Sequence, residues 1–249
     1  MTNNSRIALV TGAASGIGAA IATRLAADGA SVALLARRRD RLEKVAAQIS
    51  EAGGTALVVP ADVTEPGAVA EAAQLVQERF GDLDLLVNNA GTMKVVPFGD
   101  VPADDWRRTV DVNLTGVLTV THAFLPALKR SAATRTTDLI NVSSLAADRF
   151  MPGMAAYGAS KAGVSYLSRA LRTELAGDGI RVTNVEPGMI DGTELADQFT
   201  AELRSMVDEL RTSLPAVPPS EVAELVAYVV GRPREVNLPE LIIQPSKEV

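Results

Sequence analysis

The chain has 249 residues, of which 47% are hydrophobic and 4% aromatic, and its formal net charge is −6 at pH 7. A chain of this length can bury a substantial core within a single domain. Its acidic balance, without a large basic cluster, argues against nucleic acid as a partner. It contains no cysteine, which excludes disulfides, thiol nucleophiles and thiolate metal sites and fits a reducing compartment.

Membrane insertion and secretion are not expected. The first residues lead directly into a predicted strand and leave no room for the apolar part of a signal peptide. No apolar run approaches the roughly 18 residues that a membrane span requires. We therefore expect a soluble cytoplasmic protein with no membrane partner. No carboxylate cluster has metal-ligand spacing and the lone His122 is interpreted as structural, so no metal site is predicted.

Short β-branched runs alternate with longer helical patterns along the chain. Strands are predicted over residues 7–10, 31–36, 55–59, 83–87 and 138–142. Helices are predicted from residue 17 to about residue 28 and over residues 40–52, 66–80 and 155–175. This alternation predicts right-handed βαβ units and an α/β fold with a parallel sheet. No linker or repeat divides the chain.

A glycine-rich turn follows the first predicted strand. It contains Gly12, Ser15, Gly16, Ile17 and Gly18. A strand, then glycines, then a helix N-terminus allows backbone N–H groups and the helix dipole to face a phosphate. The spacing is Gly-x-x-x-Gly-x-Gly, whereas the common dinucleotide fingerprint is Gly-x-Gly-x-x-Gly. By itself the turn indicates either a phosphate-binding loop or a plain tight turn.

The end of the second predicted strand bears on the choice of cofactor. Many NAD sites place an acidic residue there to bind the ribose 2′-hydroxyl. Here Ala36 is followed by Arg37, Arg38 and Arg39, and guanidinium groups suit a 2′-phosphate. We therefore favour NADP(H) over NAD(H), with Arg37 and Arg38 as ligands. The alternative is that these arginines only solvate the start of the next helix.

Tyr157 and Lys161 lie four residues apart in the predicted helix over residues 155–175. That spacing places them on one helix face, about one turn apart. A nearby ammonium would lower the pKa of the phenol from its ordinary value of about 10. Ser144 follows the strand predicted over residues 138–142 and could hydrogen-bond an oxygen shared with the tyrosine. An isolated Tyr-x-x-x-Lys pattern is also typical of an ordinary amphipathic helix.

Several motifs in a fixed order resemble the signature of the short-chain dehydrogenase/reductase family. They span nearly the whole chain and read Thr11-Gly-x-x-x-Gly-x-Gly18, Asp62-Val63, Asn88-Asn89-Ala90-Gly91, Asn113-Leu-Thr-Gly, Ser144, Tyr157-x-x-x-Lys161 and Pro187-Gly188. The resemblance implies a Rossmann-type doubly wound parallel sheet of about seven strands with helices on both faces. It also implies one domain over residues 1–249.

The resemblance implies a catalytic tetrad of Asn113, Ser144, Tyr157 and Lys161. Tyr157 would be the general acid in carbonyl reduction and the base in alcohol oxidation, while Ser144 polarises the substrate oxygen. Lys161 would lower the pKa of the tyrosine and bind the nicotinamide ribose. Asn113 would hold a water molecule in the proton relay.

Further cofactor contacts follow from the same resemblance. Asp62 would meet the adenine amino group, with Val63 packed nearby, and Asn89, Ala90 and Gly91 would lie along the cofactor. Without the family context, the aspartate is typical of a capping residue. The asparagine pair is then typical of a hydrogen-bonded turn.

The segment after Pro187-Gly188 departs from the family pattern. The family usually has a threonine five residues after the proline, where its hydroxyl meets the nicotinamide carboxamide. Gly192 occupies that position here, and Thr193 follows as if one residue had been inserted. The candidates for the carboxamide contact are therefore Thr193 and the backbone of Ile190.

Residues 189–219 are predicted to form a substrate-binding lid that contains a helix over residues 193–214. A last helix over residues 221–230 and a final strand over residues 238–245 follow, and the polar residues 131–137 are predicted to form a surface loop. The candidates for an apolar substrate pocket are Met93, Leu145, Met154, Met189 and Leu195.

Together these features predict an NADP(H)-dependent oxidoreductase that interconverts a ketone or aldehyde and an alcohol by hydride transfer. A weaker similarity to the family branch that includes clavulanate dehydrogenase and NADP-dependent 3-hydroxy acid dehydrogenases implies a small-molecule substrate. It also implies a homotetramer or dimer formed through the two long helices. One alternative is a catalytically silent NADP-binding regulator, which the intact tetrad disfavours. The other is a sugar-nucleotide epimerase, which the short C-terminal region disfavours.

Overall fold

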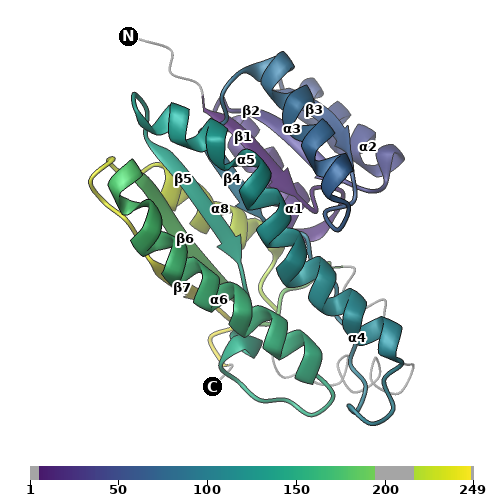
Figure 1. Cartoon of the computed structure of the whole chain (residues 1–249). Coiled ribbons are helices and arrows are strands. Elements are labelled where there is room, and N and C mark those ends of the chain that lie inside the picture. The colour runs from purple at the N-terminus through teal and green to yellow at the C-terminus, as the bar shows by residue number, and fades with distance from the viewer. Residues whose placement is uncertain (1–5, 194–215, 248–249) are drawn as a thin grey trace.

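The fold is built on one parallel sheet of seven strands, seen in the centre of Figure 1. The computed structural model describes residues 6–193 and 216–247. The strands are β1 (Ile7–Thr11), β2 (Ser31–Ala36), β3 (Thr55–Pro60), β4 (Leu85–Asn88), β5 (Thr137–Val142), β6 (Ile180–Pro187) and β7 (Glu240–Ile243). Their order in the sheet is β3-β2-β1-β4-β5-β6-β7. The order reverses between β1 and β4, and ligands of such sheets bind at the carboxyl ends of the strands beside this point.

Helices cover both faces of the sheet (Figure 1). One face carries α1 (Gly16–Ala27), α2 (Arg39–Glu51) and α8 (Pro219–Val230). The other carries α3 (Pro66–Phe80), α5 (Gly116–Ala132) and α6 (Ala155–Leu175). A short helix α4 (Ala103–Val110) and the π-helical turn η1 (Asp111–Thr115) lead directly into α5. Among the described residues, no helix is long and apolar enough to span a membrane.

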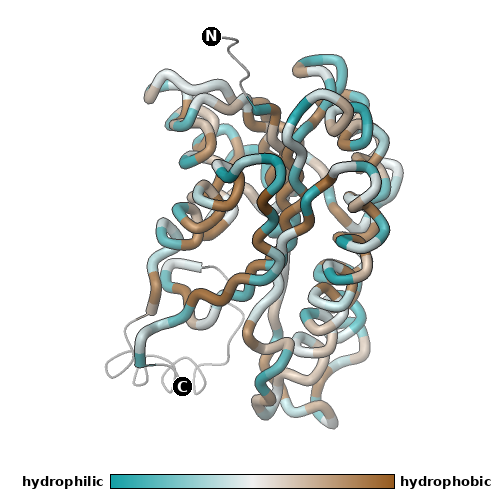
Figure 2. Tube along the Cα trace, turned by 90° about the vertical axis from the view of Figure 1, so that its left-hand side faces the viewer, coloured by the Kyte–Doolittle hydropathy of each residue, from teal (hydrophilic) through white to brown (hydrophobic). Residues whose placement is uncertain are grey.

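The strands are apolar because both faces of the sheet are buried. In β1, Ala8 and Val10 belong to the core beneath α1, α2 and α8, whereas Leu9 belongs to the core beneath α3 and α5. Successive side chains of a strand point to opposite faces, so a strand covered on both sides has to be apolar throughout. Figure 2 shows the resulting apolar strands between two layers of helices.

Charged groups are buried at the amino ends of the strands, on the edge opposite to the carboxyl ends. Asp138 accepts hydrogen bonds from Arg6 and Arg181, each at 2.7 Å. Asp84 accepts from Arg6 and from Arg135, the latter at 2.9 Å. Because each buried carboxylate meets two guanidinium groups, these charges are paired, as burial requires.

The predicted fold class is confirmed, and α3 and α6 have the predicted bounds. The surface loop predicted over residues 131–137 is shorter in the structure, where only residues 133–136 lie between α5 and β5. Ser131 and Ala132 end α5 and Thr137 begins β5, and all three are buried. The polar side chain of Ser131 is tolerated in the interior because its hydroxyl donates to the carbonyl of Asp82 at 3.2 Å.

Candidate active site

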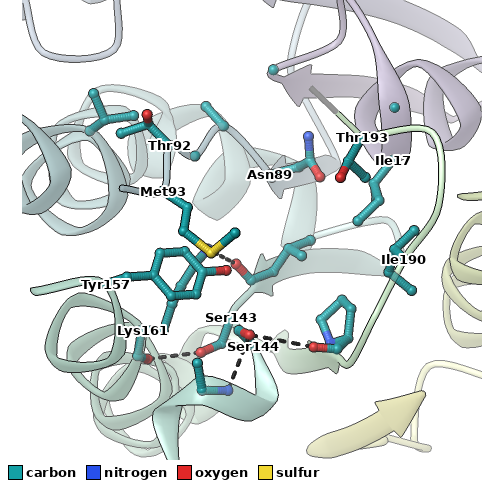
Figure 3. A pocket seen from close by; sticks show the side chains of 18 of the residues that line it. Ile17, Asn89, Thr92, Met93, Ser143, Ser144, Tyr157, Lys161, Ile190 and Thr193 are labelled. Atoms are coloured by element: carbon teal, nitrogen blue, oxygen red, sulfur yellow. Dashed lines mark hydrogen bonds between the residues drawn. The ribbon is translucent and has the colours of Figure 1, made fainter. Parts of the chain in front are cut away.

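A pocket of about 510 Å³ lies at the carboxyl ends of the strands. It is lined by these predicted site residues: Gly12, Ser15, Gly16, Ile17, Arg37, Arg38, Asp62, Val63, Asn89, Ala90, Gly91, Ser144, Tyr157, Lys161, Pro187, Gly188, Ile190 and Thr193. Figure 3 shows Met93, Tyr157 and Ser144 converging on one part of this pocket, with Ile17, Asn89 and Thr193 on another wall. The topology therefore brings together residues that are far apart in sequence. Gly18 and Asn113 lie behind the lining.

The glycine turn between β1 and α1 packs directly against the start of the loop after β4. A Cβ atom built on Gly18 would lie 2.3 Å from the carbonyl oxygen of Gly12 and 2.5 Å from Nδ2 of Asn89. That amide also donates to the carbonyl of Thr11 at 3.0 Å. The spacing Gly-x-x-x-Gly-x-Gly thus has a local physical cause: the helix begins so close to the turn that its third residue has no room for a side chain.

We expect Gly18→Ala to lower the free energy of unfolding by about 1–3 kcal/mol, the usual cost of forcing a side chain into a packed site. Gly67→Ala in α3 is the matched control, because nothing lies within 4 Å of a Cβ atom there. That variant should be unchanged or more stable by up to about 1 kcal/mol. Urea unfolding measures both. Equal stability of the two variants would contradict the assigned close contact.

Asn113 is buried in the π-helical turn η1 and is held by protein groups. Its Nδ2 donates to the carbonyl of Thr92 at 2.9 Å and to Oγ of Ser160 at 3.0 Å. Its Oδ1 accepts from the N–H of Thr92 at 2.8 Å. Both amide hydrogens are therefore used, and only acceptor atoms remain for a water molecule. The implied water-holding role stays a prediction.

Ser144 and Tyr157 line the same part of the pocket, and Oγ of Ser144 donates to the backbone carbonyl of Pro187 at 3.5 Å. Ser144 lies at the start of the short helical turn η2 (Leu145–Ala147), and its Oγ also accepts from the N–H of Ala146 at 3.2 Å. Burial raises the pKa of Tyr157 above its ordinary value of 10.0, and the nearby hydroxyl of Ser144 opposes this only in part. The phenol therefore keeps its proton at neutral pH and lies near a second hydroxyl.

The expectation that Lys161 lowers the pKa of Tyr157 is not met in this structure. The Nζ atom of Lys161 lies 5.8 Å from the centre of the tyrosine ring, and desolvation dominates instead. Burial also lowers the pKa of Lys161 from 10.5 to about 8. Its Nζ donates to the carbonyl of Val142 at 2.8 Å. No carboxylate among the described residues forms an ion pair with it.

The wall formed by the ends of β2 and β3 carries the predicted adenosine contacts. Arg37 lies at this wall with most of its side chain exposed, and its Nη1 is 3.9 Å from Oδ2 of Asp62. The other oxygen of Asp62 accepts from the N–H of Thr64 at 3.0 Å and from its hydroxyl at 2.8 Å. Asp62 is thus a turn-capping residue as well as a lining residue. Contact with adenine stays a prediction.

Thr193 and Ile190 lie in the segment where the sequence departs from the family pattern. A Cβ atom on Gly16 would lie 3.5 Å from Cα of Thr193, so this threonine sits against the glycine turn. Ile190 pairs with Val217 in an isolated parallel bridge. Their contact with a nicotinamide carboxamide stays a prediction. Apart from Thr193, the helix predicted over residues 193–214 lies outside the described residues, as does the pocket candidate Leu195.

The wall around Tyr157 is rich in methionine. Four of the chain's six methionines, Met93, Met151, Met154 and Met189, line the pocket together with Leu145. Met151 was missed in the sequence, as were the lining residues Thr92, Val95, Arg108 and Arg149. All except Arg108 lie in the loops after β4 and β5, where no periodicity marks the residues that face inward.

The sequence relatives agree with this geometry. Residues 6–204 match the family described as short chain dehydrogenase. An uncharacterized oxidoreductase of Staphylococcus aureus (strain N315) is 36% identical to this chain over 240 residues, which are 96% of this chain and 97% of that protein.

Solved structures point the same way. The closed form of a serine dehydrogenase complexed with NADP+ has a TM-score of 0.89 and 31% identity, covering 98% of this chain and 96% of that one. A variant of actinorhodin polyketide ketoreductase with NADPH has a TM-score of 0.87 and 34% identity, covering 97% of each chain. The chain therefore belongs to the short-chain dehydrogenase/reductase family and is an oxidoreductase of that family.

Proposed function

We propose that the protein is an NADP(H)-dependent oxidoreductase that reduces a ketone or aldehyde on an apolar small molecule, or oxidises the corresponding alcohol. The observation that carries the proposal is that two hydroxyl side chains, Ser144 and Tyr157, line one pocket together with Lys161 and the glycine turn. A phenol, a second hydroxyl and an ammonium at one place suit a reaction in which a carbonyl oxygen gains negative charge.

The pocket suits a dinucleotide. Gly12, Gly16 and Gly91 leave backbone without side chains along its wall, and a Cβ atom on Gly91 would reach within 3.7 Å of Nζ of Lys161. The N-terminus of α1 opens toward the same turn, where N–H groups favour a phosphate. We assign the diphosphate to this turn, the adenine to Asp62 and Val63, the middle of the cofactor to Asn89, Ala90 and Gly91, and the nicotinamide end to Lys161, Pro187, Gly188, Ile190 and Thr193.

When bound, the nicotinamide supplies or accepts the hydride. In the direction of reduction, Tyr157 holds a proton on Oη, and burial keeps it there because the raised pKa disfavours the phenolate. Ser144 donates a second hydrogen bond to the substrate oxygen as it becomes an alkoxide, and Tyr157 then transfers its proton to that oxygen. In the direction of oxidation, the phenolate of Tyr157 accepts the proton from the alcohol.

The preference for NADP(H) rests on the end of β2. Arg37 and Arg38 line the pocket there, and no carboxylate follows the strand directly. Guanidinium forks bind phosphate through paired charged hydrogen bonds. The serine dehydrogenase and the ketoreductase named above hold NADP+ and NADPH, respectively, which agrees with this preference.

The double variant Arg37→Glu/Arg38→Glu should raise the Kd for NADPH about 10²-fold. The Kd for NADH should change by less than threefold, because NADH carries no 2′-phosphate. Arg39→Glu is the control, since Arg39 follows in sequence but does not line the pocket. Fluorescence titration of the reduced cofactors gives both constants. An equal loss for NADH and NADPH would remove the arginines from the 2′-phosphate site.

The methionine-rich wall supports an apolar substrate. Methionine side chains are flexible and polarisable, so they adapt to varied apolar shapes and contact aromatic rings well. We expect aryl and alicyclic ketones to be reduced with higher kcat/KM than short polar ketones of similar reactivity. The test is NADPH and NADH oxidation with a panel of aldehydes, aryl ketones, cyclic diketones, short polar ketones, 3-keto esters and quinones. Tight binding of NADPH without turnover of any member would favour a regulator over the proposed enzyme.

A further inference from the structure

Glu186 is a buried acid that the proposed reaction does not use. It lies near the end of β6 and is 4% exposed. No ion pair to it is found in the part of the chain that the structure describes. Its Oε1 is instead 2.8 Å from Oγ of Ser165 and 2.7 Å from Nδ2 of Asn184. Carboxyl groups are rarely buried without a cation, so this placement calls for a specific reason.

The contacts of Glu186 continue into the candidate active site. Oγ of Ser165 is 2.9 Å from Oγ of Ser143, and Ser143 donates to the backbone carbonyl of Lys161 at 2.8 Å. Both serines are buried. This series of contacts thus begins at Glu186 on β6, continues to Ser165 on α6 and reaches Ser143 directly after β5. From Ser143 it returns to α6 at the backbone of Lys161. Ser143 directly precedes Ser144.

The Ser143 end of this series of contacts lies beside two groups of the site, Ser144 and Lys161. Ser143 fixes the backbone from which Ser144 projects toward Tyr157, and the carbonyl of Val142 just before it accepts from Nζ of Lys161. The loop that follows β6 from Gly188 to Thr193, called the cofactor loop because its residues are assigned to the nicotinamide end, is held by other contacts. The N–H of Gly188 bonds to the carbonyl of Ile243 at 2.8 Å, and β6 pairs with β7. Loss of the Glu186 side chain should therefore disturb Ser144 and Lys161 without opening the cofactor loop.

We propose that Glu186 is a positioning residue for the reaction, acting through Ser165 and Ser143 to hold Ser144 and Lys161 in line with Tyr157. The inference rests on the proposed function. Misplacement of reacting groups by about 1 Å can cost about 10² in rate, so the role is visible in kcat. Ser165 has one hydroxyl hydrogen for two oxygen neighbours, Glu186 and Ser143. A glutamine at position 186 can donate or accept, and so keeps the link in either direction.

The experiment compares kcat for carbonyl reduction with the Kd for NADPH in folded variants. Glu186→Ala and Ser165→Ala should each lower kcat by about 10 to 10², with the Kd for NADPH within threefold of wild type. Glu186→Gln should recover most of kcat. The kcat of the double variant should be no lower than that of the more impaired single variant, because both changes interrupt the same series of hydrogen-bond contacts.

Ser168→Ala is the matched control. Ser168 is also buried on α6, but it bonds to Asn141 and to the carbonyl of Val164. It is not part of the series of contacts from Glu186 through Ser165 to Ser143. It should lower stability and leave kcat within twofold of wild type. The proposal is overturned if Glu186→Ala and Ser165→Ala keep wild-type kcat, if Ser168→Ala loses as much, or if the Kd for NADPH rises in parallel. Turnover by the wild type tests the proposed function separately.

Discussion

Tyr157→Phe should lower the rate of carbonyl reduction by about 10³, within the range that a general acid contributes. The variant removes only the hydroxyl, so the buried ring still packs as before. Ser144 keeps its hydrogen bond from the N–H of Ala146, so no polar group is left without a partner on its side. We therefore expect the Tm and the Kd for NADPH to stay close to wild type while turnover is lost.

The control is Tyr166→Phe, nine residues further along α6, where the ring is largely exposed. That variant should have wild-type turnover. Rates are followed as NADPH absorbance with the best ketone of the panel, from pH 6 to pH 9. Because burial raises the pKa of Tyr157, its proton is held throughout this range in the wild type. Retention of more than about a tenth of the activity by Tyr157→Phe would contradict its role as the acid.

Lys161→Met should abolish most turnover and at the same time make the protein more stable at pH 7. The pKa of Lys161 falls from 10.5 to about 8 because the ammonium is desolvated, which corresponds to a cost of about 3 kcal/mol in the charged form. Removing the side-chain nitrogen also takes a partner from the carbonyl of Val142, a loss of about 1 kcal/mol. The net gain expected in the free energy of unfolding is about 2 kcal/mol.

The pH dependence gives a second check on Lys161. Below pH 8 the ammonium is charged in both the folded and the unfolded states, so the burial cost is constant. Between about pH 8 and pH 10.5 only the unfolded state keeps its proton, so the wild type gains stability as pH rises. The advantage of Lys161→Met should shrink across that window.

Urea unfolding of the wild type and of Lys161→Met at pH 7 and pH 10 measures both effects. Lys129→Met is the control, because Lys129 is partly exposed and pairs with Asp178 at 2.9 Å. This control should show no gain in stability at pH 7. A variant Lys161→Met that is less stable than wild type at pH 7 would contradict the assigned burial cost.

The sequence by itself determined the parallel sheet, because alternating strands and helices leave βαβ units as the natural connection. It also determined the bounds of α3 and α6. Pro66 marks the start of α3 and Gly81 its end, and both are local signals. Most of the predicted site residues line the pocket for a related reason. Their motifs follow individual strands, and the carboxyl ends of parallel strands meet at one edge.

Only the tertiary structure decided the features that depend on distant neighbours. The sequence predicts a polar loop over residues 131–137, but the loop covers only residues 133–136, because the carbonyl of Asp82 gives Ser131 a buried partner at the end of α5. The Tyr-x-x-x-Lys spacing predicts a lowered tyrosine pKa, yet burial by the rest of the chain outweighs the ammonium. No sequence motif marks Glu186 as a positioning residue. That role becomes visible only in the fold, where Glu186 contacts Ser165 and Ser165 contacts Ser143. The order and bounds of helices and strands depend on local residue patterns that the sequence shows. Burial and hydrogen-bond partners are established only when distant segments pack together.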